Sequence, residues 1–225
     1  MPRKPAAQED LSAKKALALE VIARLKKEYP DAACTLDYDH AWQLLVSVRL
    51  AAQCTDARVN IVVEDLFAKY PGVAALAAAE PEEIEAIVKP CGLGHSKARD
   101  ISACMRMLRD KYDCKVPTTF EELLSLPGVG RKSANLIMGD VFGKPAIVTD
   151  THCIRLCNKI GLVDGIKEPQ KVEMALWKII PPEEGNDLCH RFVMHGRAVC
   201  NARKPECEKC CLRDICRYAR ENAAT

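Results

Sequence analysis

Four cysteines near the C-terminus constrain the fold of this 225-residue chain more than any other feature. Cys200, Cys207, Cys210 and Cys216 read C-x6-C-x2-C-x5-C, a thiolate set that can close round one inorganic core. We predict a 4Fe–4S cluster that pins this loop. Tetrahedral zinc is the alternative, although structural zinc usually takes its thiolates from two short C-x2-4-C pairs, and only one is present. Cys211 could replace Cys210, and we prefer Cys210 because it completes the spacing.

The other nine of the thirteen cysteines are most simply small buried hydrophobic residues, among them Cys54, Cys153, Cys157, Cys189 and Cys211. A short secreted chain with so many cysteines would be a disulfide scaffold, but residues 1–10 contain no apolar core that could act as a secretory signal. Charges also interrupt every apolar run before the roughly 18 to 20 residues that cross a bilayer. We therefore expect reduced thiols, a cytoplasmic protein and no membrane role.

Helical periodicity runs through nearly the whole chain. Apolar residues recur at three- and four-residue spacing, as in Leu17, Val21 and Leu25 and again in Ile101, Met105 and Leu108. Prolines divide the chain into segments of ordinary helix length. We predict an all-α protein of about ten short helices, after a tail, residues 1–10, that we expect to be disordered.

Charge is nearly balanced, since 33 basic and 31 acidic residues give a net charge of +2. Bulk charge therefore does not indicate a nucleic-acid partner, and only local clustering could. Such a cluster exists near the C-terminus: Arg191, Arg197, Arg203, Lys204, Lys209, Arg213, Arg217 and Arg220. A solvated helical face is the alternative interpretation of this run.

The segment LPGVGRK, residues 126–132, joins an acidic helix-like stretch at residues 120–125 to an apolar helix that we predict to begin near Ser133. Gly128 and Gly130 allow a tight turn whose amides, with the next helix N-terminus, can face a phosphate oxygen. A plain αα-turn is the alternative. Arg131 and Lys132, directly after the turn, favour a phosphate contact.

Taken together, LPGVGRK, Thr149-Asp150-Thr151-His152 and the four-cysteine run resemble the endonuclease III family of helix-hairpin-helix DNA glycosylases. Two further segments, LAAQCTD at residues 50–56 and GLGHSKA at residues 92–98, extend the resemblance over nearly the whole chain. Thr149 and Cys153 depart from the family pattern, since related chains usually have apolar residues there.

The resemblance implies that Lys132 is the catalytic lysine and Asp150 the catalytic aspartate. A lysine amine can attack the sugar C1′ and form a Schiff base that permits β-elimination of the 3′ phosphate. The amine must be neutral, which desolvation or a nearby charge such as Arg131 would favour. Asp150 would accept a proton and stabilise positive charge on the sugar, although a helix N-cap is its plainer interpretation.

The resemblance also implies a set of DNA contacts. A glycosylase must extrude the damaged nucleotide and fill the gap that it leaves. Gln53 and Leu93 match the residues that fill it, and the other expected DNA contacts are Gly128, Gly130, Arg131, His152, Arg203 and Lys204. For His152 a structural hydrogen bond is the equal alternative.

Two helical lobes with a DNA groove between them are the implied architecture. Residues 34–144 would form the lobe with the helix-hairpin-helix motif, and residues 145–225 the lobe with the iron–sulfur loop, packed with a tail and helix from residues 1–33. Lys132 and Asp150 would then face each other across the groove. We expect the cluster to be chiefly structural and to position DNA.

The implied function is a bifunctional DNA glycosylase and abasic-site lyase that removes oxidised or saturated pyrimidines, such as thymine glycol, from double-stranded DNA. We expect a monomer, nucleoid-associated if the cell is bacterial. Two alternatives stay open. A monofunctional glycosylase would use Asp150 to activate water, and a non-catalytic DNA-binding iron–sulfur module would not need the pair of Lys132 and Asp150.

Overall fold

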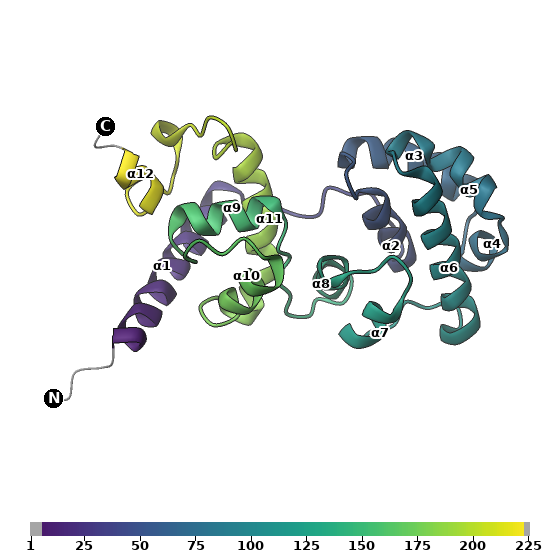
Figure 1. The fold of residues 1–225 in the computed structure, drawn as a ribbon, viewed down its shortest axis with the longest axis horizontal. Helices are drawn as coiled ribbons and strands as arrows, with labels where there is room; N and C mark the ends of the chain where they lie inside the picture. The colour runs from purple at the N-terminus through teal and green to yellow at the C-terminus, as the bar shows by residue number, and fades with distance from the viewer. Residues whose placement is uncertain (1–5, 223–225) are drawn as a thin grey trace. The chain divides into compact units, whose positions relative to one another are not determined.

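The computed structural model describes residues 6–222, with side chains from residue 10 onward, and these residues form helices with no β-strand. The prediction of an all-α protein is confirmed. Residues 6–222 contain twelve α-helices and three short 3₁₀ helices (Figure 1). The α-helices are α1 (Ala6–Glu28), α2 (Ala41–Leu50), α3 (Asp56–Lys69), α4 (Val73–Ala78), α5 (Pro81–Val88), α6 (Gly94–Tyr112), α7 (Phe120–Ser125), α8 (Arg131–Asp140), α9 (Thr151–Ile160), α10 (Pro169–Leu176), α11 (Gly185–Ala198) and α12 (Arg217–Asn222). The 3₁₀ helices are η1 (Lys89–Cys91), η2 (Pro182–Glu184) and η3 (Cys207–Lys209).

The expectation of a disordered tail over residues 1–10 is wrong for its second half. Helix α1 begins at Ala6 and continues for 23 residues, because alanine, glutamate, lysine and leucine are good helix formers. Residues 1–5 lie outside the described part of the chain. Helix α6 has 19 residues, so the helices are also not uniformly short.

Prolines begin helices here more often than they break them. Pro81 and Pro169 occupy the first turns of α5 and α10, where the missing N–H costs nothing. In α5 the Glu80 N-cap forms a capping box with Glu83. The prolines therefore divide the chain into helices as predicted, and at Pro81 and Pro169 the division falls in the first turn of the following helix.

The chain divides into two compact units. Unit 2 comprises residues 34–143, with helices α2 to α8. Its core is one continuous apolar cluster in which α4 and α5 pack against α6. Fully buried side chains hold these helices together, including Leu44, Leu66, Ile84, Met105 and Leu108.

Unit 1 comprises residues 1–33 and 144–225. Helix α11 is its centre, because α1 and α9 both pack against it, and α12 packs against α9. Buried residues from all four helices form the core: Val21, Leu25, Leu156, Phe192 and Ala219. The N-terminal helix and the C-terminal segment are thus parts of one core.

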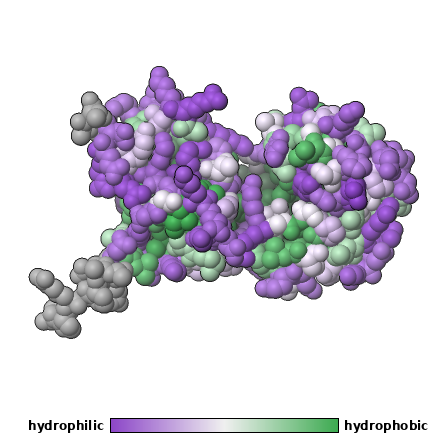
Figure 2. Space-filling view, in the orientation of Figure 1, coloured by the Kyte–Doolittle hydropathy of each residue, from purple (hydrophilic) through white to green (hydrophobic). Residues whose placement is uncertain are grey.

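Hydrophilic side chains cover most of the face shown in Figure 2, and hydrophobic ones gather in smaller patches. Within the described residues, no helix has the length and apolar character needed to cross a membrane.

The nine cysteines outside the predicted cluster set only partly follow the prediction of burial. Cys91, Cys104, Cys153, Cys157 and Cys189 are buried, but Cys34, Cys54 and Cys211 are half-buried and Cys114 is exposed. Cys114 has a positive φ of 60° in the turn after α6, where the chain leaves the core. Cys114 is therefore exposed because it lies in a turn and not on the buried face of a helix.

Candidate functional site

The predicted hairpin is present as a helix–turn–helix within unit 2. Thr119 caps α7 by accepting a hydrogen bond from the Glu122 amide, and α7 has the predicted bounds. Val129 N donates to Leu126 O at 3.1 Å and closes the turn. Helix α8 begins at Arg131, two residues before the predicted start, because the extended Gly130 already serves as its N-cap.

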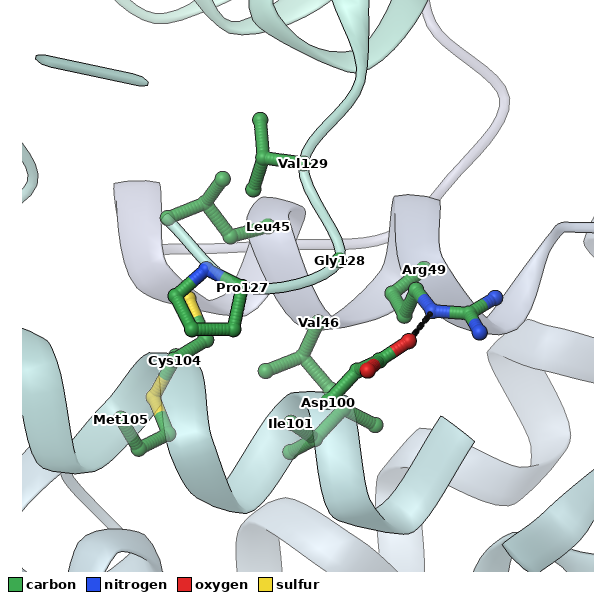
Figure 3. A pocket seen from close by; sticks show the side chains of 10 residues that line it. All are labelled: Leu45, Val46, Arg49, Asp100, Ile101, Cys104, Met105, Pro127, Gly128 and Val129. Atoms are coloured by element: carbon green, nitrogen blue, oxygen red, sulfur yellow. Dashed lines mark hydrogen bonds and ion pairs between the residues drawn. The ribbon is translucent and has the colours of Figure 1, made fainter. Parts of the chain in front are cut away.

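Gly128 and Gly130 are glycines for different reasons. Gly128 has φ +75°, and a Cβ there would lie 2.9 Å from the Asp100 Cβ and 3.1 Å from the Arg49 Cδ. Arg49 on α2 donates from Nε to Asp100 Oδ2 on α6 at 2.7 Å, so the hairpin rests on an ion pair (Figure 3). Gly130 has a negative φ and open space where a Cβ would be. Gly128 therefore serves packing, while Gly130 leaves the outer side of the turn bare.

Lys132 and Arg131 occupy the first turn of α8. Lys132 is exposed. The Arg131 guanidinium lies over the Phe120 ring at 4.9 Å, a cation–π contact that fixes its side chain against α7. The first turn of a helix also presents unpaired amides, so this end of α8 can receive an anion.

Asp150 belongs to unit 1 and is the N-cap of α9. Its Oδ1 accepts a hydrogen bond from the Cys153 amide at 2.7 Å. The carboxylate is half-buried and held in one orientation by the helix that it caps. The capping alternative is thus present in the structure, and it is compatible with a chemical role. Thr149 and Cys153 on either side are both buried, so they contribute packing around this carboxylate.

Gln53 and Leu93 lie in two loops of unit 2 and are both exposed, Leu93 to 56%. Each has a left-handed backbone, with φ 56° at Gln53 and 51° at Leu93. Such conformations are uncommon outside glycine and persist only where surrounding contacts impose them. An exposed leucine on a constrained turn fits an aliphatic wedge.

Lys97, in the first turn of α6, connects these two loops. Its side chain is 0% exposed, and Nζ donates to Leu50 O and to Cys91 O, each at 2.8 Å. Burial lowers the pKa of Lys97. The two carbonyls end α2 and η1, directly before the loops that contain Gln53 and Leu93.

His152 lies against α11 in unit 1 and is half-buried. Its Nδ1 is 3.1 Å from Arg155 Nη2, which also donates to Gly196 O at 3.1 Å and Cys200 O at 2.9 Å. A Cβ at Gly196 would lie 2.4 Å from His152 Nδ1, so only glycine fits there. These contacts connect the α9 start to the first cysteine of the predicted cluster set.

The four C-terminal cysteines follow α11 and end at the start of α12. Burial raises the pKa of Cys200, and the thiols of Cys216 and Cys207 raise it further. Burial also raises the pKa of Cys210 to about 12, with contributions from Cys211, Cys216 and Cys200. The Cys200 thiol therefore has Cys207, Cys210 and Cys216 as electrostatic neighbours. Within the described residues, no group of three or more His, Cys, Asp or Glu side chains is arranged to hold a metal ion.

Cys210 and Cys211 influence each other and Tyr29, but their remaining neighbours differ. The Cys210 sulfur is 3.3 Å from His195 Nε2 and accepts from the Leu212 amide at 3.4 Å. Burial lowers the pKa of His195 to about 4, so the ring is neutral. Its Nδ1 is 3.1 Å from the Tyr29 hydroxyl. In contrast, the charges that act on Cys211 are Glu28 and Arg24 of α1.

The basic run at the C-terminus is largely neutralised. Arg191 is 3% exposed and donates to the backbone of Tyr29. Three others form ion pairs: Lys209 with Glu206, Arg213 with Glu208, and Arg217 with Asp164. Arg203 and Lys204 are both exposed in the segment between Cys200 and Cys207.

Sequence reasoning missed the residues that position the candidate site residues through hydrogen bonds and packing. Lys97 stood inside a quoted motif without a role, and the Arg49–Asp100 pair, Arg155 and His195 were not singled out. A lysine, an arginine or a histidine inside an ordinary helix gives no signal of the carbonyl or sulfur that it will meet. Only the packing of helices distant in sequence reveals them.

Comparisons with known proteins agree with this geometry. A family model described as "HhH-GPD superfamily base excision DNA repair protein" matches residues 46–182. An endonuclease III of Synechocystis sp. is 44% identical over 207 residues, which cover 92% of this chain and 94% of that protein. A non-covalent endonuclease III–DNA complex matches with a TM-score of 0.88 and 39% identity, over 94% of this chain and 99% of the other. A trapped covalent endonuclease III–DNA intermediate with an estranged adenine matches with a TM-score of 0.88 and 40% identity, over 93% and 98%.

Proposed function

Because the chain belongs to the HhH-GPD superfamily of base excision DNA repair proteins, we propose that it is a bifunctional DNA glycosylase and abasic-site lyase. Its partner is double-stranded DNA. One observation carries the lyase half of the proposal: an exposed lysine, Lys132, follows the hairpin directly in a chain 40% identical to a protein trapped covalently on DNA.

Lys132 is the nucleophile of the proposal. Its neutral amine attacks the sugar C1′, the bond from C1′ to the base nitrogen breaks, and the base leaves with that electron pair and is protonated. The sugar ring opens to give a Schiff base between Nζ and C1′. Loss of a C2′ proton then expels the 3′ phosphate by β-elimination, and water releases the enzyme from the sugar.

Asp150 would assist at the same sugar. A carboxylate can stabilise the positive charge that develops when the glycosidic bond breaks and can accept the proton that the lysine amine loses. The Cys153 amide on Oδ1 fixes the carboxylate, so no reorganisation is needed during the reaction. The proposal requires Lys132 and Asp150 to reach one nucleotide.

DNA would be held by backbone contacts on either side of the damaged nucleotide. The bare turn at Gly130 and the amides that begin α8 suit a phosphate, with Arg131 alongside. Arg203 and Lys204 suit a second phosphate contact. Gln53 and Leu93 would fill the gap left by the extruded nucleotide, an amide toward the estranged base and an aliphatic chain between its neighbours.

A 4Fe–4S cluster held by Cys200, Cys207, Cys210 and Cys216 is part of the proposal. The donor set fits by its chemistry: Cys200 has the other three thiols as electrostatic neighbours, Cys216 is buried, and Cys200, Cys207 and Cys210 are half-buried. Four irons occupy more space than one zinc, whose thiolates must all lie about 2.3 Å from a single ion. Cys200 and Cys216 act on the Cys210 thiol, whereas the charged neighbours of Cys211 are Glu28 and Arg24 of α1, and this favours Cys210 as the third ligand. A bound cluster would fix both ends of the segment that contains Arg203 and Lys204, and phosphate contacts by these residues would need no redox chemistry.

The proposed substrates are oxidised or saturated pyrimidines, such as thymine glycol, together with abasic sites. We place the protein in the cytoplasm, at the nucleoid if the cell is bacterial, because its substrate is the chromosome.

Borohydride trapping tests the proposal. Purified protein is incubated with a duplex that contains one thymine glycol, beside an abasic-site duplex, and borohydride reduces any Schiff base to a stable crosslink. We expect a crosslink on both duplexes with the wild-type protein and with Lys111→Ala, an exposed lysine at the far end of α6, and none with Lys132→Ala. Base release without a crosslink would establish a monofunctional enzyme instead. DNA binding with neither product would leave a binding module.

A further inference from the structure

Lys97 is the one fully buried lysine in the described part of the chain, and its ammonium group contacts backbone carbonyls. A lysine is almost never fully buried unless its charge is satisfied. Here the two acceptors are the terminal carbonyls of α2 and η1, where the helix dipole places partial negative charge. The ammonium group of Lys97 therefore holds the C-terminal ends of α2 and η1 together.

The two loops that follow these carbonyls are the Gln53 turn, residues 51–55, and the Leu93 loop, residues 92–93. Gln53 stands three residues after Leu50, and Leu93 stands two residues after Cys91. Gly92 and Leu93 have positive φ angles of 72° and 51°, and Gln53 has 56°. Without fixed ends, Gln53 and Leu93 would relax toward ordinary backbone conformations.

A second contact joins the same loops. Burial and the neighbouring Cys54 thiol raise the pKa of Cys91 to about 11. Cys54 adjoins Gln53. The loops thus meet at the Lys97 ammonium and again at a pair of thiols.

We propose that Lys97 is a positioning residue that sets the Gln53 turn and the Leu93 loop at a fixed separation, so that both side chains enter the duplex together. The inference rests on the proposed function, because it assigns the two side chains to the gap left by the extruded nucleotide. Lys97 touches no substrate atom and acts only through the loops.

The structure offers a matched control on the same helix. Arg106 of α6 donates from Nε to Ala77 O at 3.2 Å and from Nη2 to Ala79 O at 3.4 Å, at the end of α4. It too fixes a helix end to α6 by hydrogen bonds from a cation to carbonyls. The end that it fixes precedes neither loop, so Arg106→Met controls for the loss of such a contact.

The test is a double-mutant cycle on single-turnover base release from a duplex with one thymine glycol. We expect Lys97→Met to slow release at least tenfold when Gln53 and Leu93 are present, and less than twofold in the Gln53→Ala/Leu93→Ala background. Arg106→Met should leave the rate within twofold in both backgrounds. An equal slowing by Lys97→Met in both backgrounds, or none in either, would overturn the inference.

Fluorescence of 2-aminopurine, placed opposite an uncleavable abasic analogue, gives a readout that does not depend on chemistry. Binding of the wild-type protein and of Arg106→Met should raise the fluorescence as the estranged base unstacks, and binding of Lys97→Met should raise it by less than half as much. Equal rises would contradict the inference even if the protein released no base. Wild-type protein that forms no borohydride crosslink would instead contradict the proposed lyase. If Lys97→Met does not fold, Lys97→Arg, which keeps the charge but alters the reach, replaces it in both measurements.

Discussion

At the scale of one residue, Asp150 caps α9, and the proposed function gives it a second, separable task at the sugar. Asparagine caps a helix about as well as aspartate but cannot neutralise developing positive charge. We therefore expect Asp150→Asn to change the free energy of unfolding by less than about 0.5 kcal/mol. Base release should slow by roughly a hundredfold or more, the usual contribution of a positioned acid–base group. Thermal unfolding and single-turnover release measure the two effects.

Asp150→Ala is the companion variant, because it removes both the charge and the cap. It should lose about 1 kcal/mol of stability in addition to the activity. Full activity in Asp150→Asn would mean that the residue only caps α9.

The adjacent pair Cys210 and Cys211 tests the ligand assignment. Cys210→Ser should abolish the visible absorbance of the proposed cluster in purified protein, because Cys200 and Cys216 act on its thiol and its sulfur lies 3.3 Å from His195 Nε2. Cys211→Ser should retain the absorbance and the iron content, since the charged neighbours of Cys211 are Glu28 and Arg24 of α1. The opposite result would move the ligand by one residue, and zinc without iron in the wild-type protein would favour the tetrahedral alternative.

In the hairpin between α7 and α8, substitutions at the two glycines should affect different properties: stability at Gly128 and DNA affinity at Gly130. Gly128→Ala adds a methyl group to a residue with φ +75°, and this methyl group would lie 2.9 Å from the Asp100 Cβ. Asp100 cannot easily move away, because it is paired with Arg49. We expect it to lose about 1–3 kcal/mol of stability, the usual cost of a strained backbone. Urea unfolding measures this loss.

Gly130→Ala should behave differently, because the space around Gly130 is open and its φ is ordinary. Stability should change by less than about 0.5 kcal/mol, as for other changes away from packed features. Affinity for an abasic-site duplex should fall, since a methyl group would stand where a phosphate approaches. Unchanged affinity in Gly130→Ala would mean that the turn does not contact DNA.

The elements themselves were predictable where local signals decide them. The acidic helix before the hairpin has its predicted bounds because Thr119 caps it and the Leu126–Pro127 step ends it. The next helix starts early because extended glycine is itself a cap. The contacts of Lys97 were not predictable, because Leu50 O and Cys91 O belong to chain segments that reach it only through the packing of unit 2.

The same limit applies to whole-chain organisation. Nothing local indicates that residues 1–33 join residues 144–225 in unit 1; the likeness to a family suggested it. The basic run is a second example of what sequence alone does not indicate. Arg191 is buried, and Arg217 pairs with Asp164, because of long-range packing. Sequence patterns indicate which residues carry charge, but the fold decides which charges remain available.

Asp164 connects the two ends of the chain within unit 1 and gives a pH dependence at the scale of the whole molecule. It accepts from Lys14 of α1 and, at 2.6 Å, from Arg217 of α12. These partners hold the pKa of Asp164 below its ordinary value. Its contribution is therefore complete above the unfolded pKa of about 3.9, and it is lost as pH falls through the lower, folded-state pKa.

We expect Asp164→Asn to destabilise the protein at pH 7 by roughly 1 kcal/mol or less, because the carboxylate is exposed and solvent screens it. The difference from wild type should begin to shrink as pH falls below about 4, where the unfolded carboxylate takes up a proton, and should vanish below the lower native pKa, where the native carboxylate is protonated as well. Urea unfolding at pH 7 and pH 3 measures both differences, with Asp113→Asn, from the exposed pair with Lys115, as the control that changes neither. If Asp164→Asn lost equal stability at both pH values, the effect would come from packing or from a hydrogen bond that asparagine cannot make. If it lost none at pH 7, the two ends of the chain would be held by the core of unit 1 alone.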